Sequence, residues 1–236
     1  PFSSAAAAIA GCATYYAPAD AVINLGGQLN ESSLSAFQGN CVHGSRDGEV
    51  ITFMTSAALT ADDDDAALDV YVYDARSDTL TRISRPQGLD DGGTYLCQTS
   101  PEVACNGDLG VNSSDGGGLN RGASGMRQWN VEERDGEYSI YFETRRRLVA
   151  EDVNGSHLDV YEWKDGELSL ISPGNSDDDA WFSGNSIDGR DVFLSTTQAL
   201  DPHREIDEDF DVYDARIGGG FAPPPDPEEG CDALGD

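Results

Sequence analysis

The sequence predicts an all-β fold, specifically a partial β-propeller of about three to four four-stranded antiparallel blades. Three observations support this: short apolar strands recur along the chain, the repeat period is about 45 to 52 residues, and Asp-Gly or acidic turns join the strands. The 27 Gly and 10 Pro of 236 residues gather in clusters typical of turns. No unit has a 3.6-residue periodicity long enough for a helix, which excludes a helical repeat.

Three copies of one pattern carry this prediction. Each has an Asp-Gly turn, an apolar strand ending in Thr, a Leu four residues later, an acidic run and an Asp-Val-Tyr triplet. The strands end at Thr55, Thr144 and Thr196, and the triplets begin at Asp69, Asp159 and Asp211. We expect the triplets to be equivalent middle strands, with their Val residues on one face and the flanking Tyr residues on the other.

The spacing between copies predicts one insertion. The second and third triplets are 52 residues apart, whereas the first and second are 90 apart. The extra segment, about residues 86–122, is expected to be a surface excursion with little core of its own. A further strand precedes each Asp-Gly turn: residues 37–40 match residues 181–185, and residues 126–129 match less well.

The blades are expected to occupy residues 1–222, and the Pro-rich residues 223–236 to form a linker or tail. A closed six-bladed ring at this period needs about 270 to 310 residues. The chain supplies three blades and part of a fourth, so we expect it to be a piece of a longer protein.

The triplets and the Phe-containing strands before the acidic runs also carry a family resemblance. They resemble the TolB-like β-propeller repeats of large secreted proteins from high-GC bacteria, over about residues 20–222. The resemblance implies a propeller fold and a location outside the cell or at its surface. It implies little about function.

The charge excludes two classes of partner. With 14 Lys and Arg against 44 Asp and Glu, the net charge is −30. A nucleic-acid binder needs a basic patch, and the triplet at residues 145–147 lies within a strongly negative chain. An anionic membrane surface is disfavoured for the same reason, and no run of 18 apolar residues is present to span a bilayer.

The five cysteines show no zinc-site spacing, so disulfides in an oxidising compartment are the better interpretation, with free buried thiols as the alternative. Cys97 and Cys105 close a short loop inside the insertion and are expected to pair. Cys12 with Cys41 is the next most plausible pair. Cys231 would then pair outside this chain.

No catalytic constellation is predicted. A G-x-S-x-G elbow is absent, and His43, His157 and His203 occupy unlike positions of the repeat, typical of solvated loop histidines. The acidic run of the second copy is different, because Asp152, Asn154 and Asp159 place oxygen ligands around a Gly. Hard cations prefer such ligands, so these residues are the candidate Ca²⁺ site, with solvated tight turns as the alternative.

Two functions stay open at this stage. The favoured one is a non-enzymatic extracellular scaffold or binding module, whose loop surface meets a protein or a glycan. The other is a fragment of a propeller hydrolase or lyase whose catalytic part lies outside this chain.

Overall fold

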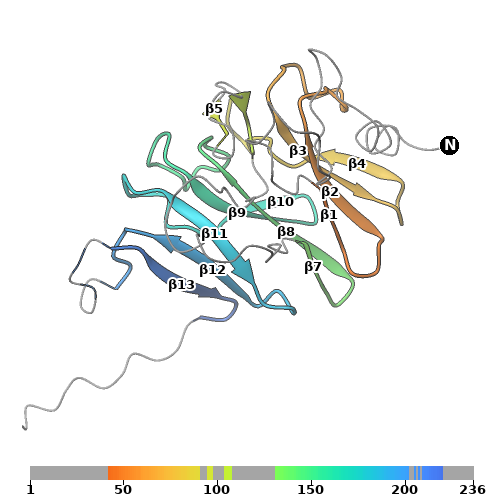
Figure 1. Cartoon of the computed structure of the whole chain (residues 1–236). Helices are drawn as coiled ribbons and strands as arrows, with labels where there is room; N and C mark the ends of the chain where they lie inside the picture. The colour runs from red at the N-terminus through yellow and green to blue at the C-terminus, as the bar shows by residue number, and fades with distance from the viewer. Residues whose placement is uncertain are drawn as a thin grey trace, which may run out of the picture.

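The computed structural model describes residues 42–90, 95–97, 104–107, 131–201, 205, 207 and 209–219, and every regular element within them is a β-strand. Three larger antiparallel sheets follow one another in chain order and lie side by side as blades (Figure 1). This confirms the all-β, partial propeller fold. Within the same ranges there is no helix that could cross a membrane.

The first two blades have four strands each and the third has three described strands, in the simple order of a meander. The first blade contains β1 (Val42–Gly44), β2 (Val50–Thr55), β3 (Asp69–Asp74) and β4 (Thr79–Arg82). The second contains β7 (Val131–Arg134), β8 (Glu137–Thr144), β9 (Asp159–Lys164) and β10 (Glu167–Leu170). The third contains β11 (Ala180–Asn185), β12 (Asp191–Thr196) and β13 (Asp211–Arg216).

The three copies share one strand register. In each blade the Thr that ends the second strand pairs with the Asp of the triplet: Thr55 with Asp69, Thr144 with Asp159, and Thr196 with Asp211. The predicted equivalence of the triplets is therefore confirmed. The expectation that all three are middle strands holds for β3 and β9, whereas β13 is the outer strand of its sheet in the described part of the chain.

The first strand of the first copy corrects the sequence alignment. Val42 pairs with Phe53, and at the matching position of the third blade Phe182 pairs with Leu194. The proposed match of residues 37–40 to the third copy is therefore four to five residues too early, and those residues lie outside the described ranges. The bulge in β11 between Phe182 and Gly184 accounts only for the one-residue difference in this offset between the two ends of the strand.

The hydrophobic core lies between the blades, because the first two sheets bury both of their faces and the third buries the face toward the second. Val70 packs with Phe142 between the first two blades, and Val160 packs with Phe182 between the second and third. The Tyr of each triplet lies on the opposite face of its sheet. Tyr161, for example, packs toward the first blade. This two-residue alternation confirms the predicted opposite faces of Val and Tyr.

The insertion departs from the sequence expectation. Its strands β5 (Tyr95–Leu96) and β6 (Ala104–Cys105) form a small sheet closed by the predicted Cys97–Cys105 disulfide, with a Cα–Cα distance of 4.8 Å. Both cysteines are buried, and β6 bonds to the chain just before β3, through Leu68 N to Ala104 O at 2.8 Å. This part of the insertion therefore joins the core rather than lying on the surface. Cys12, Cys41 and Cys231 lie outside the described residues.

Candidate metal centres in the acidic loops

Each blade carries one acidic loop between its second and third strands: residues 56–68, 145–158 and 197–210. The Thr before each loop starts it, because its Oγ1 accepts the backbone N–H two residues later, at 2.9 to 3.1 Å in all three blades. This turn explains why Thr recurs at the end of the strand. Because neighbouring strands are antiparallel, these loops and the connections between blades lie at one end of the sheets, and the Asp-Gly turns lie at the other.

The triplet Tyr fixes the middle of each loop. Its hydroxyl accepts the backbone N–H of the loop Leu in every blade, and in the first two blades it donates to a loop carboxylate, Asp63 or Asp152. The Tyr161 hydroxyl lies 2.6 Å from Asp152 Oδ2. Burial together with the adjacent carboxylate raises the pKa of the Tyr161 hydroxyl, so it stays protonated and remains a donor.

A second anchor holds the triplet Asp. Ser84 donates to Asp69 Oδ1 at 2.6 Å, and Ser172 donates to Asp159 Oδ1 at 2.5 Å. Each Ser Oγ also accepts the N–H of the triplet Val at 3.0 Å. In each of the first two blades, two carboxylates are therefore held in place, one within the acidic loop and one at its end.

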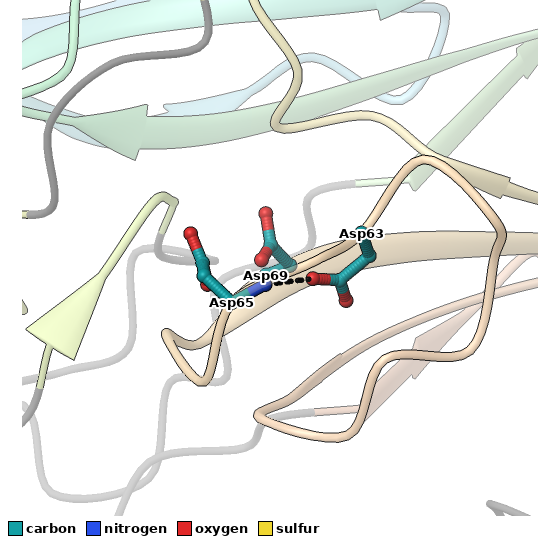
Figure 2. A group of neighbouring side chains, drawn as sticks. All are labelled: Asp63, Asp65 and Asp69. Atoms are coloured by element: carbon teal, nitrogen blue, oxygen red, sulfur yellow. Dashed lines mark hydrogen bonds between the residues drawn. The ribbon is translucent and has the colours of Figure 1, made fainter.

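In the first blade these contacts gather three carboxylates. Asp63, Asp65 and Asp69 each offer an oxygen, and the three oxygens lie within 4.8 Å of one another (Figure 2). Asn106, delivered by the insertion, donates its Nδ2 to both Asp65 Oδ2 at 3.2 Å and Asp69 Oδ2 at 3.1 Å. Burial raises the pKa of Asp69 to about 6, against the hydrogen bond from Ser84.

A buried arginine balances this charge in the first blade. Arg82, on β4, has a fully buried side chain and lies 3.7 Å from both Asp63 Oδ1 and Asp69 Oδ1. It also lies 3.4 Å from Asp62 Oδ2 and donates to the Asp62 carbonyl at 2.6 Å. A cation supplied by β4 thus balances the charge of the first acidic loop.

The second blade holds the residues that the sequence singled out. Asp152 and Asp159 are both buried, and Asn154 donates its Nδ2 to Asp159 Oδ2 at 2.8 Å. Asp152 Oδ1 and Asn154 Oδ1 are buried and have no hydrogen-bond partner. Burial raises the pKa of Asp152 and of Asp159, and the charge of Asp152 raises that of Asp159 further. A buried acceptor without a partner costs about 1 to 3 kcal/mol.

The third blade also has acids in its loop, but two of them lie one residue later than in the second blade. Glu205 and Asp207 are five and seven residues after the loop Leu, whereas Asp152 and Asn154 are four and six residues after it. Asp211 is at the same position as Asp159. Glu205 Oε2 is also buried without a hydrogen-bond partner. Burial, followed by the charge of Glu205, raises the pKa of Asp211.

The sequence predicted that Asp152, Asn154 and Asp159 form one group. In the structure Asn154 bonds Asp159, and Tyr161 and Ser172 hold the two carboxylates. Sequence reasoning missed Ser172, although a Ser follows the triplet Asp by 13 residues here and by 15 in the first blade. It also missed Arg82 and Asn106. The insertion carries no repeated pattern that could have pointed to Asn106.

Comparison with known proteins adds little to this picture. No family model and no curated protein matches the chain. Among solved structures, TolB from Acinetobacter baumannii matches with 16% identity over 70% of this chain and 41% of the TolB chain, at a TM-score of 0.16. The chain spans less than half of that protein. The fold assignment therefore rests on the register and order of the sheets themselves.

Proposed function

We propose that this chain is a non-enzymatic, TolB-like β-propeller module that works outside the cell or at its surface as a scaffold or binding unit. One observation carries the proposal. Several buried polar side chains recur in the first two blades and make the same contacts there, as Tyr71 and Tyr161 or Ser84 and Ser172 do. Groups that recur in this way support the fold of each blade rather than converge on one reaction centre.

The disulfide supports the proposed location. A bridge between Cys97 and Cys105 persists in an oxidising compartment and is rare in proteins of the cytosol. The net charge of −30 also favours a module that stays soluble and does not self-associate.

The binding surface is proposed to be the end of the sheets that carries the acidic loops. Exposed acids occur there in the loops and in the connection between the second and third blades: Asp64, Glu151, Asp177, Asp207 and Asp209. The partner is a protein or a glycan, and these charges favour a basic protein surface. Electrostatic attraction of this kind speeds association and weakens as salt is added.

Two variants with equal charge change test this proposal. Asp64→Lys with Asp177→Lys alters the loop end, and Glu49→Lys with Glu167→Lys alters the turn end. Binding to an immobilised basic protein, a neutral polysaccharide and an acidic polysaccharide is measured at low and high salt. We expect saturable, salt-sensitive binding to one probe, lost in the loop-end variant and kept in the turn-end variant.

The same protein is assayed with chromogenic peptide, ester and glycoside substrates. Equal binding by both variants would contradict the assignment of the surface. Turnover above the blank that disappears on substitution of a single acid would instead identify the chain as part of a propeller hydrolase.

A further inference from the structure

The first two blades differ at one position that lies against the acidic loop. Arg82 on β4 pairs with Tyr71, and Leu170 on β10 pairs with Tyr161. These two positions are equivalent, because both Tyr residues bond the loop carboxylate. Gly174 lies between Leu170 and the second acidic loop. A Cβ atom added to this glycine would be 2.4 Å from Leu170 Cδ2 and 3.2 Å from Asp152 Cα. The leucine side chain therefore lies beside the second acidic loop.

In the first blade the arginine supplies the positive charge that the loop requires. Its guanidinium lies within 3.7 Å of Asp63 and Asp69, both of which are buried. A buried carboxylate needs such a partner, because removal from water disfavours its charged form.

In the second blade Leu170 takes this place. Arg147, which follows the buried Arg146 on the loop, is near enough to Asp152 to lower the pKa of that carboxyl, but by less than burial raises it. Arg145 forms an ion pair with Asp179. Arg147 donates to two backbone carbonyls, Val149 O at 3.3 Å and Ala150 O at 2.7 Å. The guanidinium groups of Arg145 and Arg147 therefore have other bonding partners, and Leu170 offers no charge.

The oxygens of the second loop are left with bonding capacity. Asp152 is 1% exposed, and its Oδ2 accepts a hydrogen bond from Tyr161. The Asn154 N–H is near enough to lower the pKa of this carboxyl, but Asp152 Oδ1 makes no hydrogen bond of normal geometry. Asn154 Oδ1 is buried and equally without a partner, while its Nδ2 links it to Asp159. Unsatisfied buried acceptors of this kind call for a water or an ion. Two carboxylates beside a neutral leucine favour the ion.

We propose that a divalent cation, Ca²⁺, binds in the second acidic loop, with Asp152 Oδ1 and Asn154 Oδ1 as ligands and Asp159 as the second negative charge. The ion takes the role that Arg82 fills in the first blade. The ligand set contains only oxygen, which suits a hard cation and not zinc. Ca²⁺ is favoured over Mg²⁺ because it accepts irregular coordination, and the exposed backbone around Gly155 leaves room for water ligands. This inference does not depend on the partner proposed above.

The test measures how many Ca²⁺ ions bind per molecule in matched variants of the whole chain. Isothermal titration with CaCl2 gives this number, and Tb³⁺ luminescence excited through tyrosine is the second measurement. Asp152→Asn removes a ligand charge, and Asp64→Asn makes the same change at an exposed acid of the first loop. We expect Asp152→Asn to lose one ion per molecule, or to bind it at least about tenfold more weakly. Asp64→Asn should bind as the unmodified protein does.

A second pair of variants tests the role of the arginine. Leu170→Arg copies the first blade and should abolish the same ion while raising the melting temperature in the absence of Ca²⁺. Leu170→Met should keep the ion. If Leu170→Arg does not fold, the comparison of Asp152→Asn with Asp64→Asn decides alone. The proposal is overturned if the unmodified protein binds no Ca²⁺, or if Asp152→Asn keeps the full ion count.

Discussion

Removal of methyl groups from the triplet Val residues measures how much the stacking of blades stabilises the protein. Val160 is fully buried between the second and third blades, whereas Val212, at the same repeat position, is 53% exposed. Val160→Ala deletes two methyl-sized groups, each with a transfer free energy of about 0.8 kcal/mol, and leaves a small cavity. The expected loss is about 2 kcal/mol of unfolding free energy. Val212→Ala should cost about 0.5 kcal/mol, because half of that side chain already meets water.

Urea denaturation followed by tryptophan fluorescence checks these values, with the melting temperature as a second measure. A loss of 2 kcal/mol corresponds to a decrease of about 4 to 8 °C for a protein of this size. Val70→Ala serves as a replicate, because Val70 is buried in the same way between the first two blades. Equal losses for Val160→Ala and Val212→Ala would refute the arrangement in which each triplet Val packs on the following blade.

Four further predictions concern the cross-link and the charges. Reduction of the Cys97–Cys105 bridge, or its replacement by two serines, should cost about 2 to 3 kcal/mol by chain entropy, measured by urea denaturation with and without reductant. The Asp69 carboxyl, whose pKa is about 6 against an ordinary 3.8, should titrate near pH 6 in ¹³C NMR spectra, with the signal identified by Asp69→Asn. The folded state holds that proton more tightly than the unfolded state does. Asp69 therefore contributes about 3 kcal/mol of stability below about pH 4, and this contribution is lost as the pH rises through 6. A titration of Asp69 near pH 4 would contradict this. Arg82→Leu should lower stability by about 3 kcal/mol, because it leaves Asp63 and Asp69 buried without their cation, and a loss below 1 kcal/mol would show that the pair is not needed. Finally, the melting temperature should rise with NaCl, because salt screens the repulsion within a chain of net charge −30.

Several features of the fold could be predicted because they depend on short stretches of chain. The Asp-Gly turns need positive φ, and Gly48, Gly136 and Gly189 have φ of 77°, 83° and 61°. The alternation of Val and Tyr in the triplets follows from the two-residue period of a strand, and the spacing of Cys97 and Cys105 allows only a tight loop between them. Each of these properties is settled within about ten residues, so a local pattern suffices to find it.

The chain of 236 residues by itself determined the repeat, the β-sheets, the acidic loops and the second-loop oxygens. Only the tertiary structure decided how the charges of those loops are balanced. Asn106 reaches Asp65 and Asp69 because β6 bonds to the backbone beside Leu68, although 41 and 37 residues separate them. Arg82 balances the first loop because β4 pairs with β3. Charge balance in a buried site depends on which strands and segments come together in space, and no local pattern of residues reports that.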